Sequence, residues 1–211
     1  MKAHPLRLIK ALKSCIELFA SRGGYLNSTG WYRSRVTLDS VDVSGEPIPW
    51  ITYACLRFLE HRISPSMSIF EYGSGSSTLW WAKRVRNVVS CEHDKEWFER
   101  TSARAPSNVR MIHASRENGN YEKQILRYKN EFDIVIIDGR DRVACAINCI
   151  SSLKDGGIIV WDNTDRDEYA DGYTFLRDQG FRRVDFASMT PINLFECSTS
   201  IFYRNDNCLH L

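Results

Sequence analysis

The stretch that decides the fold runs from Met67 to Glu92 and reads MSIFEYGSGSSTLWWAKRVRNVVSCE. It begins with a short apolar segment typical of a buried strand and then passes through two glycines. A helical pattern follows over Ser77–Arg84, and a second strand pattern over Asn87–Glu92. A strand, a glycine-rich turn, a helix and another strand make one βαβ unit, which predicts a parallel sheet covered by helices.

The alternation of strand and helix continues along the rest of the chain. Further strand patterns occur at Val109–His113, Asp133–Asp138 and Gly157–Asp162, and helical patterns at Asp94–Ala103, Tyr121–Lys129, Val143–Leu153 and Tyr169–Gln179. The last two strand patterns, Phe181–Ala187 and Ser198–Tyr203, are joined without a helix, which indicates an antiparallel hairpin. We therefore predict an α/β protein with a doubly wound Rossmann-like sheet, mostly parallel, with one antiparallel strand from a C-terminal β-hairpin.

The first 62 residues follow a different pattern. Leu6–Ala20 carries an apolar stripe interrupted by charged residues, which predicts an amphipathic helix and excludes a membrane-spanning one. Leu26–Pro49 is rich in turn-forming residues, and Trp50–His61 resumes a helical pattern. We expect the first helix to pack on the rest of the chain or on a second subunit in a homodimer, with a membrane surface as the alternative partner. The chain is thus divided into an N-terminal helix with a substrate-covering segment, residues 1–62, and a cofactor-binding domain, residues 63–211.

Composition and charge exclude several classes of protein. The net charge is +2 over 211 residues, which gives no basic footprint for nucleic acid. The seven cysteines are odd in number and scattered, and none forms a C-x-x-C pair, so neither a disulfide framework nor a zinc site is indicated. We expect a cytoplasmic protein that acts on a small molecule rather than on nucleic acid and is not an integral membrane protein.

The glycine-rich turn favours one kind of cofactor over others. Gly73 and Gly75 can adopt positive φ angles and allow a ligand to approach the backbone closely, and the next helix offers free N–H groups to an anion. A dinucleotide fingerprint would place a third glycine where Thr78 stands, which disfavours NAD and FAD. The Lys-Ser/Thr pair of a nucleotide-triphosphate loop is also missing after this turn.

A single carboxylate sharpens this interpretation. Glu92 lies 21 residues after Glu71 (92 − 71), at the end of the next strand pattern. A carboxylate at that place can accept both hydroxyls of an adenosine ribose. The structural alternative is a helix-capping charge, although Asp94 is better placed for that role. Loop and acid together predict a nucleoside-containing cofactor.

Glu71-x-Gly73-x-Gly75, with an acidic residue closing the next strand, resembles motifs I and II of class I S-adenosylmethionine-dependent methyltransferases. The resemblance extends over about residues 68–203 and departs at Ser77, where many members have a third glycine. It implies S-adenosylmethionine as the cofactor, with its ribose at Glu92 and its adenine after the third strand. The residues that the resemblance places around the cofactor are Glu71, Gly73, Ser74, Gly75, Ser77, Thr78, Glu92, His93, Ser115, Arg116 and Asp138.

Two acids end neighbouring apolar strands further along the chain. Asp138, Asp162 and Asn163 should meet at the carboxyl edge of the sheet, where ligands bind. Two carboxylates and an amide oxygen suit Mg²⁺ or Ca²⁺, and their placement is similar to that in catechol-type O-methyltransferases, which implies a metal held by these three residues. The alternative is a metal-free site in which Asp138 or Asp162 is the catalytic general base. The nearby Arg140 and Arg142 favour an anionic substrate over a metal.

The sequence therefore predicts S-adenosylmethionine-dependent methyl transfer to a hydroxyl of a small-molecule acceptor. The segments GEPIPW (residues 45–50) and FEYGSGSSTLW (residues 70–80) are similar to those of a group of bacterial methyltransferase-like proteins. Some proteins of that group belong to polysaccharide biosynthesis, which implies a sugar or polysaccharide precursor as the acceptor. The alternative is a non-catalytic or regulatory domain that keeps the fold and binds S-adenosylmethionine or a nucleoside.

Overall fold

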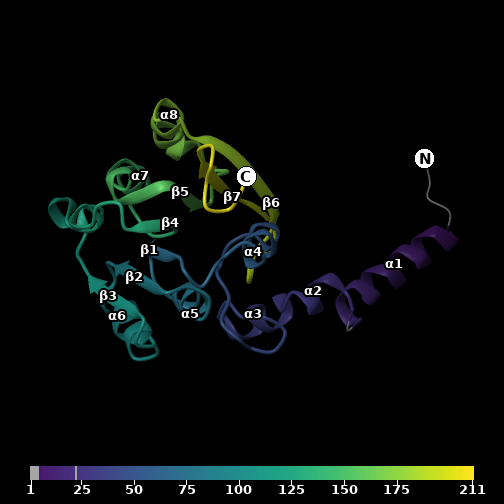
Figure 1. Ribbon diagram of the computed structural model, residues 1–211. Helices are drawn as coiled ribbons and strands as arrows, with labels where there is room; N and C mark the ends of the chain where they lie inside the picture. The colour runs from purple at the N-terminus through teal and green to yellow at the C-terminus, as the bar shows by residue number, and fades with distance from the viewer. Residues whose placement is uncertain (1–4, 22) are drawn as a thin grey trace.

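The computed structural model describes residues 5–21 and 23–211, and within these ranges seven strands form one sheet in the order β3-β2-β1-β4-β5-β7-β6 (Figure 1). Strands β1 to β5 run parallel, and β7 runs antiparallel to both of its neighbours. The predicted doubly wound sheet with one reversed strand is thereby confirmed. The strands are β1 (Ser68–Tyr72), β2 (Asn87–Glu92), β3 (Val109–His113), β4 (Phe132–Ile137), β5 (Leu153–Asp162), β6 (Arg182–Met189) and β7 (Glu196–Tyr203).

The parallel order brings the ends of four strands to one edge of the sheet. Tyr72 at the end of β1 pairs with Cys91 of β2 and with Ile137 of β4. Ile137 pairs in turn with Trp161 of β5. The carboxyl ends of these strands therefore lie side by side. The strand order reverses between β1 and β4, which is the place where open α/β sheets bind their ligands.

Alternate side chains of the strands fill two cores, one on each face of the sheet. On β4, Ile134 and Ile136 belong to the first core, whereas Val135 and Ile137 belong to the second. Each fully buried aliphatic side chain of this kind contributes roughly 1.5–3 kcal/mol to stability. Because both faces are covered, the central strands are apolar on both sides, which explains their continuous hydrophobic sequence.

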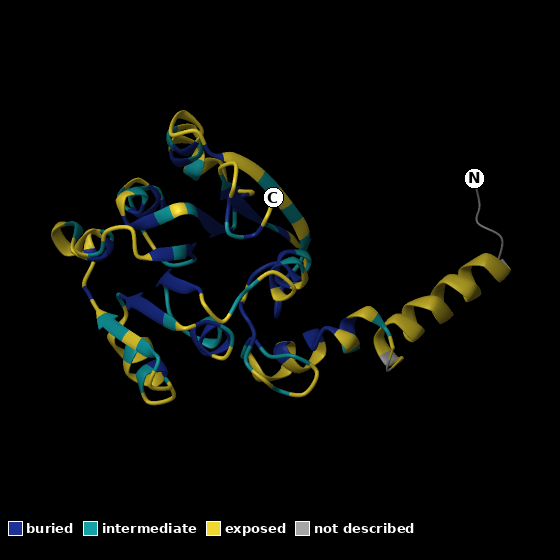
Figure 2. Ribbon diagram, viewed as in Figure 1, coloured by how far each residue is buried: buried dark blue, intermediate teal, exposed yellow. Residues whose placement is uncertain are grey.

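Helices cover both faces of this sheet (Figure 2). They are α4 (Tyr53–Glu60), α5 (Ser76–Ala82), α6 (Lys95–Ser102), α7 (Arg142–Asn148) and α8 (Ala170–Asp178). Side chains of α4 and α5 belong to the first core, and side chains of α7 and α8 to the second. Short 3₁₀ turns, η3 (Ile150–Ser152) and η4 (Asp167–Tyr169), lie after α7 and before α8.

One predicted helix is wrong. Where the sequence pattern indicates a helix over residues 121–129, the structure has only the 3₁₀ turn η2 (Gln124–Arg127), which follows another, η1 (Glu117–Gly119). Asn118 has a φ of 56°, and Tyr128 is extended, so the backbone leaves the helical region on both sides of η2. The apolar spacing that suggested a helix reflects buried side chains on these tight turns.

The N-terminal region consists of α1 (Pro5–Ala20), α2 (Tyr25–Ser28) and α3 (Trp31–Thr37). α1 projects away from the rest of the molecule with its apolar side chains exposed, so the expectation that it packs on the rest of the chain is wrong (Figures 1 and 2). Helices α2 and α3 are too short to give a recognisable periodicity, yet Leu26 and Trp31 are buried in the first core. The division of the chain at residue 62 remains a prediction. None of the described helices is long and apolar enough to cross a membrane.

Candidate active site

The glycine-rich turn connects β1 to α5 at the reversal point of the sheet. Gly73 has a φ of 91°, and a Cβ atom there would lie 3.1 Å from the backbone of Asp138. Gly75 has a φ of 155°, and a Cβ atom there would lie 3.3 Å from the indole nitrogen of Trp97. That indole donates a hydrogen bond to the carbonyl of Ser74. Glycine is therefore required at both positions, because the turn is packed closely between the end of β4 and α6.

Glu71 lies beneath this turn and is almost fully buried. Its Oε2 accepts hydrogen bonds from Thr78 Oγ1 at 2.5 Å and from Ser90 Oγ at 2.8 Å. Its Oε1 is buried without a hydrogen-bond partner in the structure. Burial raises the pKa of Glu71 to about 7, and the hydroxyls of Thr78 and Ser90 offset only part of that rise. Thr78, the residue that disfavours a dinucleotide, therefore positions an acid next to the turn.

Glu92 braces the turn from the end of β2. Its Oε2 accepts the backbone N–H of Ser74 at 2.8 Å. Its Oε1 accepts the backbone N–H groups of His93 and Asp94 at 2.8 and 2.9 Å. The Ser74 hydroxyl also donates to Oε2 at 3.2 Å, so four donors already meet the roughly four acceptor positions of this carboxylate, and a ligand hydroxyl would have to replace one of them. The ribose role of Glu92 stays a prediction, but its structural role is to hold the backbone of two loops together.

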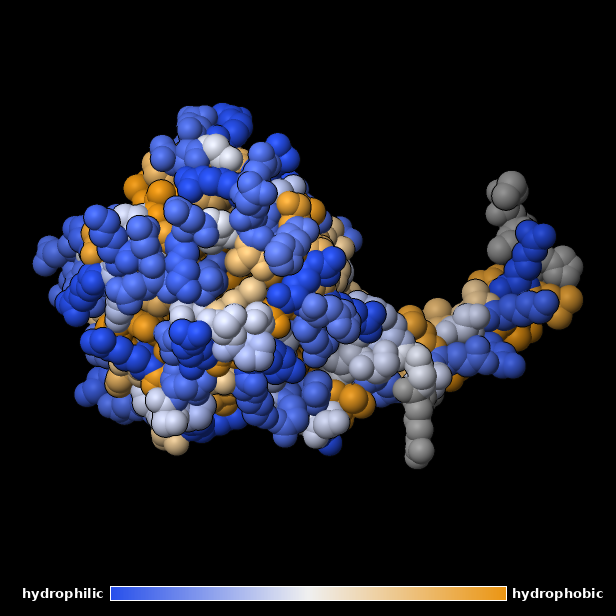
Figure 3. Space-filling model, viewed as in Figure 1, coloured by the Kyte–Doolittle hydropathy of each residue, from blue (hydrophilic) through white to orange (hydrophobic). Residues whose placement is uncertain are grey.

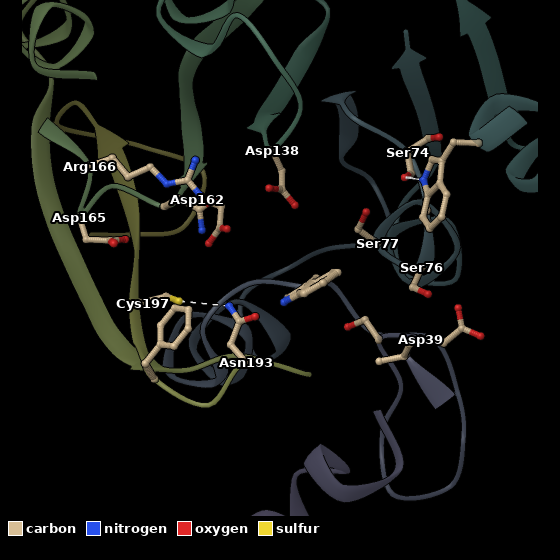
Figure 4. Close-up of a pocket in the computed structure, with 17 residues that line it drawn as sticks. Asp39, Ser74, Ser76, Ser77, Asp138, Asp162, Asp165, Arg166, Asn193 and Cys197 are labelled. Carbon is tan, nitrogen blue, oxygen red and sulfur yellow. Dashed lines mark hydrogen bonds between the residues drawn. The ribbon is translucent and has the colours of Figure 1, made fainter. Parts of the chain in front are cut away.

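Two adjoining cavities open at this edge of the sheet. The first, of about 520 Å³, is bounded by Leu38, Trp50, Asp162, Asn193 and Phe195, among others (Figure 4). The second, of about 630 Å³, lies over the turn, and its lining includes Gly73, Glu92, His93, Gly139 and Arg140. The residues that line both are Trp50, Ser74, Ser77, Trp97, Asp138, Asn163 and Arg166. The two cavities thus form one site with two compartments.

The predicted adenine-contacting residues lie outside this lining. Ser115 is exposed and borders neither cavity. Arg116 forms a bidentate ion pair with Asp141, with both nitrogen–oxygen distances at 2.7 Å. Their contact with the adenine stays a prediction.

Asp138 follows β4 and lies at the wall between the two cavities. Arg142 Nη2 donates to Asp138 Oδ1 at 3.0 Å, and the same guanidinium donates to the carbonyls of Gly139 and Asp162. Burial raises the pKa of Asp138, and the charge of Arg142 opposes that rise. Arg142, itself buried, therefore ties the end of β4 to the end of β5 and favours the ionised form of Asp138.

Asp162 ends β5 and faces the first cavity (Figure 4). Its Oδ1 accepts the hydroxyl of Thr199 at 2.5 Å, and Thr199 Oγ1 accepts the backbone N–H of Thr52 at 3.0 Å. Burial raises the pKa of Asp162, and the charge of Asp138 raises it further. The arrangement holds a carboxyl group with a raised pKa in a fixed orientation at the cavity wall.

The structure does not support the metal predicted at Asp138, Asp162 and Asn163. Among the described residues, no group of three or more His, Cys, Asp or Glu side chains is placed to hold a metal ion. Arg142 already supplies a cation to Asp138, and Thr199 occupies one oxygen of Asp162. A guanidinium at this place repels a divalent ion, so the donor set does not fit Mg²⁺.

Several residues of the site were missed in the sequence. Thr199 lies within β7 and reaches Asp162 because β7 pairs with the end of β5, whereas Arg166 lies in the loop after β5; neither belongs to a sequence motif. Trp97 follows Asp94 by three residues, and the Asp94 side chain accepts its backbone N–H at 2.8 Å. That capping signal places the start of α6 and could have placed Trp97 against the turn.

A seven-stranded sheet with one reversed strand, a glycine-rich turn after β1 and an acid after β2 together define the class I methyltransferase fold. Residues 70–164 match a family model described as a methyltransferase domain. No curated protein sequence matches the chain.

Solved structures with the same fold include several methyltransferases. An S-adenosylmethionine-dependent O-methyltransferase from Thermotoga maritima is 14% identical, with 74% of this chain and 67% of that chain covered and a TM-score of 0.56. An rRNA methylase from Streptococcus thermophilus is 15% identical, with 74% and 100% covered and a TM-score of 0.55. A putative methyltransferase from Streptococcus mutans in complex with SAH is 13% identical, with 70% and 94% covered and a TM-score of 0.52. At these identities the likeness establishes the fold alone.

Residues 70–164 are therefore a methyltransferase domain, and the chain has the fold of class I S-adenosylmethionine-dependent methyltransferases. The residues present fit S-adenosylmethionine, because the turn at Gly73 leaves the backbone open to a ligand and the buried Glu71 Oε1 lacks a partner. The predicted cofactor and enzyme class are thereby confirmed, whereas the residue-by-residue contacts remain predictions.

Proposed function

We propose that this methyltransferase acts on a hydroxyl of a small-molecule acceptor, with Asp162 as the general base. The observation that carries the proposal is the position of Asp162 in the first cavity, next to the compartment over the glycine-rich turn. When bound there, S-adenosylmethionine supplies an electrophilic methyl group. Asp162 would accept the proton of the acceptor hydroxyl, which makes the oxygen a better nucleophile.

The environments of the two acids support Asp162 over Asp138 as the base. Both have raised pKa values, but Asp138 forms a direct ion pair with Arg142 at 3.0 Å, which lowers its proton affinity. Asp162 receives a hydrogen bond from the neutral Thr199 instead. A general base works best when its pKa is near the working pH, and burial moves Asp162 in that direction.

The lining of the first cavity supports a polar acceptor of sugar size. Asp39, Asp165 and Asn193 supply hydrogen-bonding groups around the cavity, and Trp50 supplies a flat apolar wall. A sugar or a polysaccharide precursor has hydroxyls that can bond to these polar side chains, and an apolar ring face that can pack on Trp50. The acids in this cavity repel a phosphate backbone, which supports a small molecule over nucleic acid. The scattered cysteines support the cytoplasm as the proposed compartment.

The proposal is tested by calorimetry and by a methyl-transfer screen on the same protein. S-adenosylhomocysteine should bind to wild type and to Asp162→Asn with affinities within about threefold, because Asp162 does not line the second cavity. A screen of sugars and sugar precursors should give transfer that Asp162→Asn reduces about 10²- to 10⁴-fold. The exposed Asp171→Asn on α8 serves as the matched control and should keep full activity.

Three results would each contradict part of this proposal. Absence of S-adenosylhomocysteine binding would remove the cofactor assignment. Full activity of Asp162→Asn would leave the methyltransferase in place but would remove Asp162 as the base. Tight binding without transfer to any hydroxyl compound would favour the alternative of a non-catalytic, cofactor-binding domain.

A further inference from the structure

α1 is an amphipathic helix whose apolar side chains, apart from Phe19 at its end, pack against no other part of the described chain. Leu8, Ile9, Leu12 and Ile16 are 58–64% exposed, and Phe19, which stacks edge-on against Tyr32, is still 47% exposed. Figure 3 shows the apolar side chains of α1 exposed beside its hydrophilic ones, away from the body of the molecule. Monomeric proteins rarely leave such an apolar stripe open to water, so α1 is built to contact a further partner.

The two faces of α1 differ in character, although Leu6 and Leu18 fall on the charged side. At 100° per residue, Leu8, Ile9, Leu12, Ile16 and Phe19 fall on one side of the helix. The other side carries the charged residues Arg7, Lys10, Lys13 and Glu17 together with Ser14. A helix with this division has one surface suited to an apolar phase and one suited to water or to charged groups.

The charge on the polar face selects the kind of partner. Three basic residues and one acid give α1 a net charge of +2. Glu17 lies 3.8 Å from Lys13, so the positive charge of Arg7 and Lys10 is left without a counter-charge on the helix. A basic polar face beside an apolar face of leucine, isoleucine and phenylalanine fits an anionic lipid surface.

We infer that α1 lies in the interface of an anionic lipid bilayer, with its apolar face toward the acyl chains and Arg7 and Lys10 among the headgroups. A second copy of the chain fits less well, because the only acid of α1, Glu17, is paired with Lys13 and leaves none to meet Arg7 and Lys10 of a partner helix. The stripe also spans only 16 residues, about two heptads, whereas a stable coiled coil takes three or four. The inference concerns where the enzyme works and does not depend on the identity of the acceptor.

Co-sedimentation of the full chain with vesicles tests this inference. Vesicles of phosphatidylcholine with phosphatidylglycerol should bind the protein about fivefold more strongly than vesicles of phosphatidylcholine alone, and added salt should reduce the difference. Ile9→Asp combined with Ile16→Asp should lower binding about tenfold or more, because it places charges on the apolar face. Arg7→Glu combined with Lys10→Glu should remove the preference for anionic vesicles while the apolar face stays intact.

A matched control keeps the test specific. Ile147→Asp changes an exposed isoleucine on α7, 45% exposed, and should bind vesicles as wild type does. Every variant should bind S-adenosylhomocysteine normally, which shows that it is folded. Equal binding to both kinds of vesicle, or binding to neither, would overturn the inference. A dimer that forms with rising concentration and is abolished by Ile9→Asp with Ile16→Asp would show that the partner is a second copy.

Discussion

The two compartments of the site are built in opposite ways. The compartment over the turn takes more than half of its lining from one stretch, residues 73–100, whose loops are tied together by Glu92, and most of the rest from residues 138–142. The other compartment combines segments that lie far apart in the chain, such as residues 38–50 and the hairpin at 190–199. The first is therefore specified by local sequence and the second by tertiary packing. We therefore expect that substitutions in one compartment change its own function, cofactor binding or methyl transfer, without changing that of the other.

The largest effect on cofactor binding should come from Gly73→Ala. A Cβ atom at this residue meets the backbone of Asp138 at 3.1 Å, and the φ of 91° is unfavourable for any side chain. The strain should weaken S-adenosylhomocysteine binding about 10- to 100-fold, measured by calorimetry. Gly180→Ala is the control, because it has a φ of 82° but nothing within 4 Å of its Cβ position. Equal losses in both variants would show that backbone strain, and not the close approach to Asp138, is responsible.

Glu71→Gln should change how the free energy of unfolding depends on pH. The folded-state pKa of Glu71 is raised to about 7, so the folded protein holds a proton that the unfolded chain loses at lower pH. The free energy of unfolding of wild type should therefore fall as the pH rises from about 4.5 to about 7, and Glu71→Gln should flatten that fall by about 2–3 kcal/mol. Urea unfolding at pH 5 and pH 8 measures it, with the exposed Glu131→Gln as control. The same pH dependence in wild type and Glu71→Gln would contradict this reading of the buried acid.

Thr199→Val should change the pKa of Asp162 in the first cavity and leave the compartment over the turn unchanged. The Thr199 hydroxyl stabilises the charged form of Asp162 and so lowers its pKa. Without it the pKa of Asp162 rises further, so the rising limb of kcat against pH should move about one unit toward alkaline pH, and kcat at neutral pH should fall about tenfold. Ser188→Ala is the control. It removes a comparable hydrogen bond, which the Ala54 backbone N–H donates to Ser188 Oγ at 3.2 Å, and this bond does not involve Asp162. An unshifted pH profile in Thr199→Val would mean that Asp162 is not the base.

The smallest effect should come from metal ions. Because Arg142 neutralises Asp138 where a divalent ion would sit, millimolar Mg²⁺ or EDTA should change the initial rate by less than about twofold. A loss of activity in EDTA that Mg²⁺ restores would show that Arg142 yields its position to a metal in the working enzyme.

The same contrast explains how much the sequence could predict. The mostly parallel sheet with its C-terminal hairpin and the turn at Gly73 followed from local patterns of apolar residues and glycines, and the structure confirms them. The contact between Thr199 and Asp162 joins residues 37 positions apart, and no local pattern reports it. The metal prediction was not supported because the sequence places Arg142 near Asp138 but does not show which way its guanidinium turns. The amphipathic helix predicted for α1 is present, but the spacing of its apolar residues does not show which partner the apolar face contacts.

The bracing of the turn by Glu92 has a consequence for the energetics of cofactor binding. Its two oxygens fix the backbone N–H groups of Ser74, His93 and Asp94 in the unliganded protein. Ordering one residue of a flexible loop costs roughly 1–2 kcal/mol, and here that entropy is lost during folding rather than on binding. The affinity for the cofactor is thus set in part by the stability of the fold, and a change that loosens the domain should weaken binding without touching a ligand-contacting atom.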